Sequence, residues 1–489
     1  DRPATRPGRA AEETRDADAY PAADLYPNAH CPHTYADGHP IYPRWLSMKP
    51  NSYFLLSLGC AKNTVDSESM ALLLGDAGFS PASKPAKASV LIVNTCGFIK
   101  PAIDESIQNL RELARLKRSG QLLIAAGCLT QRFSQMVAEQ VPGIDGILGT
   151  RRWMDIVDLV QKLRRDRPTG PLFHLPEAPT VGSDEHGAAR VAIQGGSAYI
   201  KIADGCRRPC AFCSIPLIKG TAVSRPPQSI LAEARRLSEG GVQELILIAQ
   251  DTTDYGHDLG MKNGLSHLLE QLVAAVPDMP WIRLLYAYPG YVTDRLIRVM
   301  ADNPSILPYL DMPLQHAHPM TLRRMRRPAN IDWVHRTLQK MRSAMPDLAL
   351  RTTFIVGYPG ETEQEFQTLL DFIREVQFDH VGAFTYFSEE GTARELLGDT
   401  VPLEIKEQRL ERLMLAQQSI SLARNQRFIG QTLPVLVEGC SDGISVGRSY
   451  RDAPEVDGLV IAEGTAEPGQ MVSVKVTGAL SYELSGVVV

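Results

Sequence analysis

The sequence predicts a multidomain α/β protein with a parallel α/β domain, a larger parallel barrel and a small antiparallel β-barrel at the C-terminus. Two observations lead to this prediction. From residue 50 to residue 427, short apolar runs alternate with amphipathic helical stretches, a pattern typical of parallel sheets that are covered by helices. From residue 428 onward, short β-runs are interrupted by glycines, which favours a small antiparallel barrel.

Length and composition limit the classes of protein to consider. A chain of 489 residues is too long for one ordinary domain, and a net charge of −5 provides no general basic field for nucleic acid. Six of the eight cysteines fall into two patterned groups, which is unlike the disulfide framework of a secreted protein, so we expect a reducing, cytoplasmic compartment. No apolar run approaches the roughly 18 residues of a membrane span, so we expect no membrane partner.

Residues 1–49 lack hydrophobic periodicity and are rich in turn-forming residues. Such a composition cannot offset the entropy of ordering by burying apolar surface. We therefore predict that residues 1–49 are a disordered extension and that the first folded domain occupies residues 50–165.

Three predicted strands of the first domain each end at a cysteine. These strands span residues 52–58, 89–94 and 121–126, with helices expected at 66–75 and 103–117. Cys60, Cys96 and Cys128 follow them, each next to a glycine. Because ligands of α/β sheets bind at the carboxyl ends of the strands, the pattern favours a shared cluster site over three inert core thiols.

The second domain begins after a stretch without periodicity. Residues 166–194 combine Pro, Gly, Asp and His, which predicts a linker or a flap. Residues 195–427 contain six strand candidates and several helices, which suit a parallel barrel, complete or partial. The strand candidates span residues 198–203, 244–249, 281–286, 309–312, 350–356 and 380–385, and helices are expected at 227–239 and 403–427.

Cys206, Cys210 and Cys213 follow the first strand of this barrel. Three thiolates at this spacing can bind one inorganic cluster, and such soft ligands select iron–sulfur or zinc. A closed zinc site needs four protein ligands and no fourth Cys or His is close in sequence, so we expect one metal position to be open to a substrate. The alternatives are a zinc knuckle that uses a distant ligand, or a disulfide with a spare thiol.

The Cys-x3-Cys-x-aromatic-Cys pattern, with Phe212 as its aromatic residue, resembles the signature of the radical S-adenosylmethionine (SAM) enzymes. The resemblance implies a partial (β/α)6 barrel in which the three cysteines hold a 4Fe-4S cluster and SAM chelates its open iron. Segments 240–244 and 353–361 resemble SAM-binding segments of this family. The cofactor contacts that the resemblance implies are Phe212, Gly240, Gly241, Glu244, Ile355, Gly357 and Glu361.

Segments 58–68, 94–99 and 126–129 resemble the N-terminal domain of the methylthiotransferases, and residues 428–489 resemble their TRAM domain. The resemblance implies that the three cysteines of the first domain hold an auxiliary 4Fe-4S cluster, which carries the sulfur to be transferred. It also implies that SAM serves both as the radical source that opens a C–H bond and as the methyl donor. No catalytic residue is assigned beyond the cluster ligands.

Within this family, the residues around Cys60 and Cys96 and the run 309–316 resemble the branch that modifies the β-carbon of an aspartate in small-subunit ribosomal protein twelve. Asp311 and His316 mark this branch, without an assigned role. The expected partners are this ribosomal protein, an electron donor such as flavodoxin or ferredoxin, and a sulfur source. Two alternatives stay open: a tRNA adenosine methylthiotransferase with the same machinery, and an iron–sulfur carrier.

The charge of the C-terminal segment bears on the choice of substrate. Residues 430–489 contain eight acidic and three basic side chains, a net charge of −5. Such a domain repels a phosphate backbone, so tRNA is an unlikely partner, whereas a basic ribosomal protein would be attracted. The alternative is that these acidic residues only keep the surface soluble.

Overall fold

The computed structural model describes residues 50–182, 187–395 and 398–489. The predicted disordered extension, residues 1–49, lies outside the described residues. Within the described part of the chain, no helix combines the length and the apolar character that crossing a membrane requires. The fold class predicted from the sequence is confirmed, with two differences of detail in the strands.

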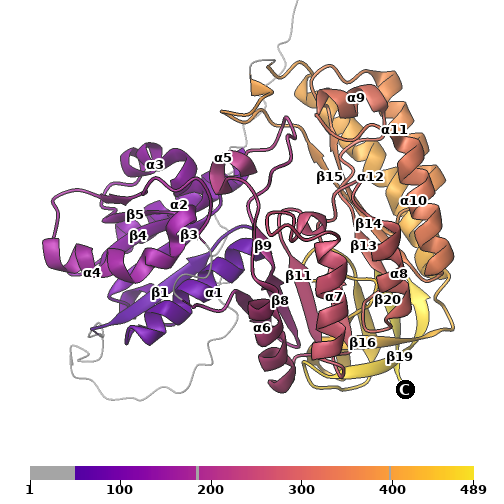
Figure 1. The fold of residues 1–489 in the computed structure, drawn as a ribbon, viewed down its shortest axis with the longest axis horizontal. Coiled ribbons are helices and arrows are strands. Elements are labelled where there is room, and N and C mark those ends of the chain that lie inside the picture. The colour runs from indigo at the N-terminus through magenta and orange to yellow at the C-terminus, as the bar shows by residue number, and fades with distance from the viewer. Residues whose placement is uncertain (1–49, 183–186, 396–397) are drawn as a thin grey trace, which may run out of the picture. The chain divides into compact units, whose positions relative to one another are not determined.

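The N-terminal domain is a fully parallel six-stranded sheet with the order β2-β1-β3-β4-β5-β6 (Figure 1). Helices α1 and α4 pack on one face of the sheet, and α2 and α3 pack on the other, so that two apolar cores flank it. Its elements are β1 (Ser52–Ser57), α1 (Ala61–Asp76), β2 (Ser80–Pro81), β3 (Val90–Thr95), α2 (Lys100–Leu116), β4 (Leu122–Gly127), α3 (Cys128–Gln140), β5 (Gly146–Gly149), α4 (Ile156–Asp166) and β6 (Leu172–His174).

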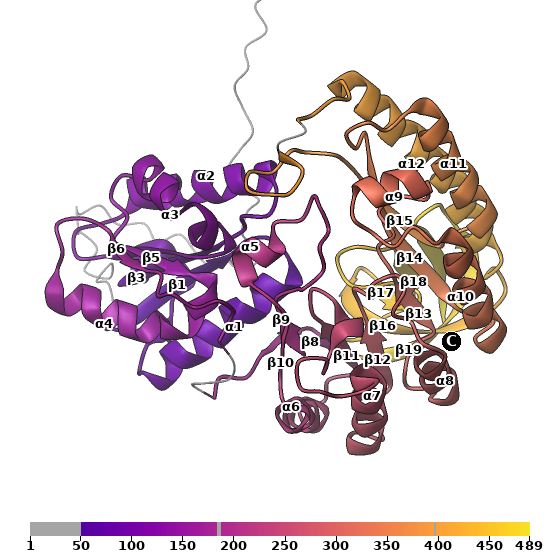
Figure 2. The ribbon, with the colours of Figure 1, turned by 45° about the horizontal axis from the view of Figure 1, so that its top comes forward.

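The second domain is an open barrel of six parallel strands, with helices along its outer side (Figure 2). Strands β8, β11 and β12 form one ladder and β13, β14 and β15 another, and a single bridge from Ile282 to Ile306 lies between them. The six strands are β8 (Ser197–Lys201), β11 (Glu244–Ile248), β12 (Trp281–Leu284), β13 (Tyr309–Asp311), β14 (Ala349–Val356) and β15 (His380–Thr385). Strand β9 (Ala203–Asp204) pairs antiparallel with β10 (Val223–Ser224) in a separate two-stranded sheet. The helices are α5 (Ile215–Lys219), α6 (Pro227–Glu239), α7 (Gly264–Ala275), α8 (Asp294–Asp302), α9 (Pro319–Arg324), α10 (Ile331–Ala344), α11 (Glu363–Val376) and α12 (Leu403–Gln426).

The segment predicted as a linker, residues 166–194, contributes strands to both neighbouring sheets. Strand β6 extends the N-terminal sheet beside β5, and β7 (Val191–Gln194) pairs antiparallel with β8. Both strands are only three or four residues long. Runs this short carry too few residues to show a two-residue periodicity, which explains why the sequence pattern does not reveal them.

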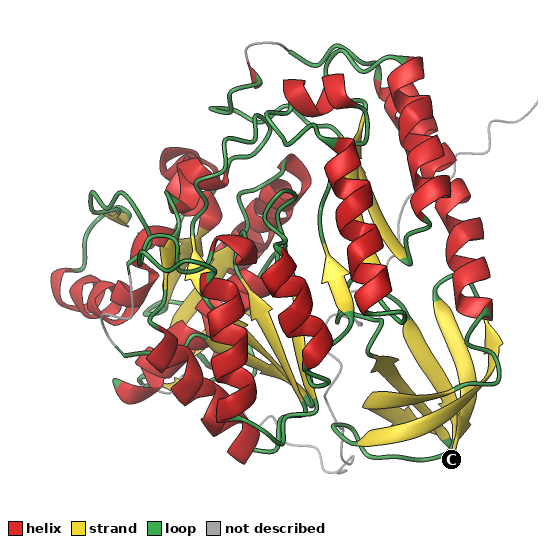
Figure 3. Cartoon of the chain, turned by 45° about the vertical axis from the view of Figure 1, so that its right-hand side comes forward, coloured by secondary structure: helices red, strands yellow, loops and turns green. Residues whose placement is uncertain are grey.

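The C-terminal domain is a closed five-stranded barrel with the order β16-β17-β18-β20-β19 (Figure 3). Four of its strand pairs are antiparallel, as predicted, but β18 and β20 run parallel. This difference arises because β19 crosses over to pair with β16, so that β20 fills the gap between β18 and β19. The strands are β16 (Thr432–Ser441), β17 (Ile444–Ser449), β18 (Leu459–Glu463), β19 (Met471–Ala479) and β20 (Glu483–Val488).

The C-terminal barrel packs on the amino ends of the parallel strands of the second domain. Glu244, the first residue of β11, accepts hydrogen bonds from Arg448 of β17. Asp379, which precedes β15, pairs with Arg451. Buried apolar residues of both domains fill the junction. The carboxyl ends of the parallel strands lie at the opposite end and are left for a functional site.

Candidate active site

Three cysteines of the N-terminal domain lie at one edge of its sheet. Cys60, Cys96 and Cys128 follow β1, β3 and β4, which are adjacent strands. Cys60 is the N-cap of α1, and Cys128 is the first residue of α3. The partial positive charge of these helix N-termini favours thiolates there. The fold therefore brings together the three thiols that the sequence analysis groups.

Glycines beside Cys60 and Cys128 allow the chain to pack closely around these cysteines. Gly59 has a φ of +94°, and a Cβ atom added to it would lie 2.9 Å from Cys96 Cβ and 3.2 Å from Cys96 Sγ. Gly127 has a φ of +105°, and its added Cβ would lie 2.4 Å from Asn94 Oδ1. Only glycine tolerates both the backbone conformation and the close approach. Three thiols at one sheet edge are a donor set that suits a bound cluster.

The thiols of this site differ in their acidity. Burial raises the pKa of the Cys128 thiol to about 12 and also raises the pKa of Cys96. Burial acts in the same direction on Cys60, but the Lys62 ammonium and the backbone N–H of Asn63 outweigh it and lower the pKa of that thiol. Because cysteine binds metal as a thiolate, metal binding here must release protons.

The other three cysteines lie in the cluster loop (residues 206–213), between β9 and α5. The Cys206 N–H donates a hydrogen bond of 3.0 Å to the carbonyl of Gly220, and the Ala211 N–H donates one of 2.9 Å to the carbonyl of Met325. These bonds attach the loop to α5 on one side and to the end of α9 on the other. Burial raises the pKa of the Cys206 thiol to about 11.

Cations and aromatic rings surround the Cys210 sulfur. Arg327 Nη1 lies 3.6 Å and the Tyr288 hydroxyl 3.8 Å from Cys210 Sγ, and the Arg327 guanidinium stacks over the Tyr288 ring at 4.2 Å. Arg208 Nε donates a hydrogen bond of 2.6 Å to Asp251. Hydrogen bonds and charges next to ligand sulfurs tune iron–sulfur clusters, so these side chains suit the surroundings of such a group.

Two of the expected SAM contacts lie in or beside the cluster loop: Phe212 belongs to the loop, and Ile355 packs next to it. Phe212 and Ile355 pack against a buried group formed by Met325, Tyr358 and Tyr386. The Phe212 and Tyr358 rings meet edge to face, with their centroids 6.5 Å apart. These side chains form an apolar wall next to the cysteines.

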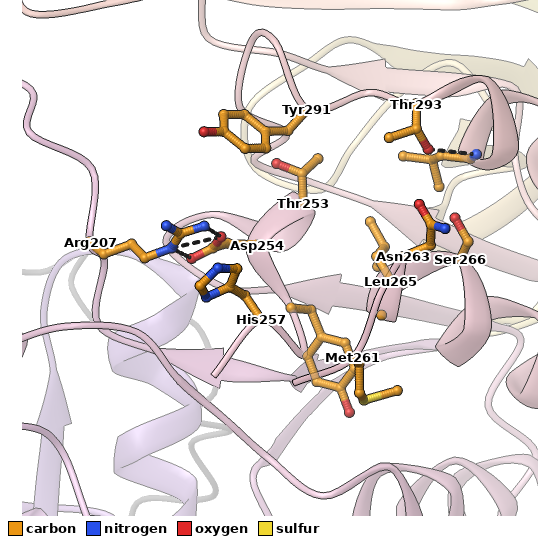
Figure 4. A pocket seen from close by; sticks show the side chains of 13 residues that line it. Arg207, Thr253, Asp254, His257, Met261, Asn263, Leu265, Ser266, Tyr291 and Thr293 are labelled. Carbon is orange, nitrogen blue, oxygen red and sulfur yellow. Dashed lines mark hydrogen bonds and ion pairs between the residues drawn. The ribbon is translucent and has the colours of Figure 1, made fainter. Parts of the chain in front are cut away.

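A cavity of about 190 Å³ lies next to the cluster loop, at the carboxyl ends of β11 and β12 (Figure 4). Arg207 Nε donates hydrogen bonds of 2.7 and 3.0 Å to the two carboxylate oxygens of Asp254 at the cavity wall. Parallel barrels bind their ligands at this end of the strands. The other polar residues that line this cavity include Thr253, His257, Asn263, Ser266 and Tyr291.

Gly240, Gly241 and Glu244 are not brought to the cluster loop. Gly240 is the C-cap of α6, Gly241 follows it with a φ of +85°, and Glu244 is the first residue of β11. They therefore lie at the amino ends of the strands, whereas the cluster loop follows the carboxyl ends. The glycine pair ends a helix, and Glu244 bonds to Arg283 at 2.6 Å and to Arg448 at 2.8 Å. This placement gives no support to a contact of these residues with SAM, which stays a prediction.

Gly357 and Glu361 have structural neighbours that explain their identity. A Cβ atom added to Gly357, whose φ is +71°, would lie 2.2 Å from Cγ of Lys406, so glycine permits α12 to pack closely. Glu361 is buried and accepts a hydrogen bond of 3.1 Å from Arg409. Burial raises the pKa of Glu361 to about 7. Neither position shows a contact with the cluster loop.

The two branch markers are both buried. Asp311, at the end of β13, accepts hydrogen bonds from the Tyr286 N–H at 3.0 Å and from Arg351 at 2.9 Å. His316 Nε2 lies 3.8 Å from the Glu361 carboxylate and has no hydrogen-bond partner among the described residues. Burial lowers the pKa of His316 to about 3, so this imidazole is neutral.

A buried charge network connects the two cysteine sites. Asp66 of α1 pairs with Lys219 at 2.9 Å, with Arg190 at 3.2 Å and with Lys201. Asp204 pairs with the same three cations. All five side chains are almost fully buried, so each needs its partners in place. Sequence analysis does not identify this network, because Asp66 and Lys219 are 153 positions apart.

Asp251 and Asp254 are further residues that the sequence analysis misses. They follow β11 directly and hold Arg208 and Arg207 of the cluster loop. A signal is present, because they are polar residues just past a buried apolar strand. The rule that groups the three cysteines of the first domain also applies to these carboxylates.

Every cysteine in the described residues is a free thiol. The three thiols of the cluster loop are therefore all present as possible ligands of one inorganic group.

Comparisons with known proteins agree with this division of the chain. Residues 52–149 match the model of the uncharacterized protein family UPF0004, residues 200–373 match the radical SAM superfamily and residues 429–489 match the TRAM domain. The "Ribosomal protein uS12 methylthiotransferase RimO" of Roseiflexus sp. (strain RS-1) is 47% identical, and the match covers 89% of this chain and 96% of the relative. The protein of the same name from Herpetosiphon aurantiacus is 49% identical, over 89% of this chain and 100% of the relative.

The chain belongs to the RimO methylthiotransferase family. Enzymes of the RimO family use SAM and two 4Fe-4S clusters, which agrees with the two three-cysteine sites. Among solved structures, the radical SAM methyltransferase TsrM from Kitasatospora setae is similar, with a TM-score of 0.54 and 14% identity over 81% of each chain. At this identity, the likeness shows a shared fold only.

Proposed function

We propose that this enzyme attaches a methylthio group to the β-carbon of an aspartate in ribosomal protein uS12, small-subunit ribosomal protein twelve. The observation that carries this proposal is the pair of three-cysteine sites, one at the sheet edge and one in the cluster loop, within a chain whose relatives are named for that reaction. An iron–sulfur carrier has no need for a SAM-dependent barrel.

In this proposal, Cys60, Cys96 and Cys128 hold the auxiliary 4Fe-4S cluster, and the cysteines of the cluster loop hold the radical SAM cluster. When bound, these groups and SAM supply the one-electron chemistry and the sulfur that an unactivated C–H bond requires. The protein's own side chains position the reactants. Arg327 and Tyr288 fix the Cys210 sulfur, and Phe212 belongs to the apolar wall next to the cysteines.

The cysteine assignment predicts separable losses. Changing Cys206, Cys210 and Cys213 together to Ala should leave about four irons per chain and abolish reductive SAM cleavage under anaerobic conditions. Changing Cys60, Cys96 and Cys128 to Ala should also leave about four irons, but SAM cleavage should persist while the methylthio product is lost. The assignment is wrong if the first variant still releases 5′-deoxyadenosine, or if the second still forms product.

The surface of the C-terminal barrel supports a basic protein as the substrate. Arg448 and Arg451 are both buried, so Lys475 is the one exposed base in residues 430–489, all of which the structure describes. An acidic surface attracts a basic ribosomal protein and repels an RNA backbone. The exposed acids are Glu438, Asp442, Glu455, Glu463 and Glu467.

A binding titration of the full-length enzyme tests this substrate. The affinity for uS12 should fall as salt rises, because screening weakens the attraction, and tRNA should bind negligibly. Preference for tRNA in the same titration would favour the tRNA adenosine methylthiotransferase alternative. We further propose that an electron donor such as flavodoxin or ferredoxin and a separate sulfur source serve the enzyme in the cytoplasm.

A further inference from the structure

Helix α5 is a direct connection between the two cysteine sites. It begins two residues after Cys213 and ends at Lys219, whose side chain reaches α1 of the N-terminal domain. Arg151 of the N-terminal domain holds α5 by donating hydrogen bonds of 2.8 and 2.9 Å to the carbonyls of Leu217 and Ile218. Helix α5 also packs against α3, the helix that begins at Cys128. The end of the cluster loop is thus anchored at the auxiliary site.

The Lys219 ammonium lies among the groups that surround the auxiliary cysteines. Lys219 is 2% exposed and pairs with Asp66, which is one helical turn after Asn63 in α1. Asn63 Oδ1 in turn accepts a hydrogen bond of 3.8 Å from the Cys128 thiol. Helix α5 carries Lys219 and contacts α3, which begins at Cys128, while Asp66 belongs to α1, which is capped by Cys60. Lys219 therefore lies where α5 meets the two helices that begin at auxiliary cysteines.

We propose that Lys219 is the charge partner of the auxiliary cluster. A 4Fe-4S core bound by three thiolates carries net negative charge, and an added electron or an anionic sulfur ligand increases it. A buried ammonium nearby stabilises this charge far more than it would in water, because the surrounding dielectric is low. This inference rests on the proposed function, in which Cys60, Cys96 and Cys128 hold that cluster. Lys219 is thus a positioning residue with an electrostatic role.

The competing interpretation is that Lys219 serves only as an ion-pair partner that docks α5 on α1. The sign of the change in cluster potential separates the two interpretations. The Asp66 carboxylate and the Lys219 ammonium form one ion pair but carry opposite charges, so they act on a nearby anionic cluster in opposite directions. Removing either charge breaks the same ion pair, but the two removals change the electrostatic potential at the auxiliary cysteines in opposite directions.

The test uses full-length protein in which Cys206, Cys210 and Cys213 are Ala, so that only the auxiliary cluster is present. Lys219→Met and Asp66→Asn are introduced separately, and the midpoint potential is measured by a redox titration followed by electron paramagnetic resonance. We expect Lys219→Met to disfavour reduction at least tenfold, about 59 mV for one electron. We expect Asp66→Asn to shift the potential the other way. An unchanged potential in Lys219→Met, or shifts of the same sign in both variants, overturns the proposal.

Lys219→Arg keeps the test decisive if Lys219→Met fails to take up iron. Recovery of the iron content and of the parent potential in Lys219→Arg supports the charge role, since the guanidinium retains the charge. Failure of Lys219→Arg to recover either one overturns it. If the parent with intact Cys60, Cys96 and Cys128 binds no iron, the cluster assignment under the proposed function fails, and this inference fails with it.

Discussion

Replacing Glu244 by Gln should destabilise the junction between the second domain and the C-terminal barrel without weakening SAM binding. Glu244 is fully buried and accepts hydrogen bonds from Arg283 and Arg448, which are buried as well. Breaking a buried pair of this kind costs about 3–5 kcal/mol. Although burial opposes ionisation, the two arginines lower the pKa of Glu244 from 4.5 to about 2, which corresponds to about 3 kcal/mol in favour of the folded, ionised form.

Thermal unfolding of the cluster-loaded protein measures this loss. The Glu244→Gln variant should melt about 6–12 °C below the parent, since about 1 kcal/mol corresponds to 2–4 °C for a large domain. Because the folded-state pKa is depressed, the stabilisation is complete above the unfolded value of 4.5 and is lost as the pH falls towards 2. The difference between parent and variant should therefore be about 1 kcal/mol smaller at pH 4 than at pH 7.

Glu438→Gln is the matched control. Glu438 pairs with the same Arg448, but its side chain is 41% exposed, so its loss should cost less than about 1 kcal/mol. The structural reasoning is refuted if Glu244→Gln melts like the parent and binds SAM at least tenfold more weakly. That result would restore Glu244 as a cofactor contact.

Two further predictions concern Arg327 beside the cluster loop and a pair of glycines elsewhere in the barrel. Arg327→Met should lower the midpoint potential of the radical SAM cluster, because it removes a cation 3.6 Å from Cys210 Sγ. The potential is measured in the variant that lacks the auxiliary cysteines. An unchanged potential would show that this contact has no electronic effect. Gly357→Ala should destabilise the protein by more than about 1 kcal/mol in thermal unfolding, because its Cβ would overlap Lys406. Gly240 has a φ of −78°, so Gly240→Ala should be tolerated and should leave SAM cleavage intact. The explanation of both glycines fails if Gly357→Ala and Gly240→Ala have the same melting temperature.

Local patterns predict much of this fold. Helix α6 and strand β15 have the bounds that the sequence predicts, because hydrophobic periodicity and helix-start signals are encoded within each segment. The grouping of Cys60, Cys96 and Cys128 follows in the same way, since each sits just past its own strand. The order of the parallel strands then brings the thiols to one edge.

Contacts between distant segments are what the sequence does not reveal. Glu244 and Arg448 are 204 positions apart, and nothing in either local sequence indicates that they pair. The parallel pairing of β18 with β20 is equally non-local, because it depends on where β19 crosses. Gly240 and Gly241 illustrate a different difficulty. A glycine pair that ends a helix looks the same as one that approaches a ligand, and only its position relative to the strand ends distinguishes the two roles.

The attachment of the C-terminal barrel to the amino ends of the strands sets a minimum size for the substrate. The cluster loop lies beyond the opposite ends, so the two surfaces are separated by at least the length of β11, which is five residues or about 16 Å. An extended chain spans about 3.3 Å per residue, so a peptide of fewer than about five residues around the target aspartate cannot reach both surfaces at once. We therefore expect such a peptide to react without help from the acidic barrel, whereas longer substrates, including the folded ribosomal protein, can use both surfaces.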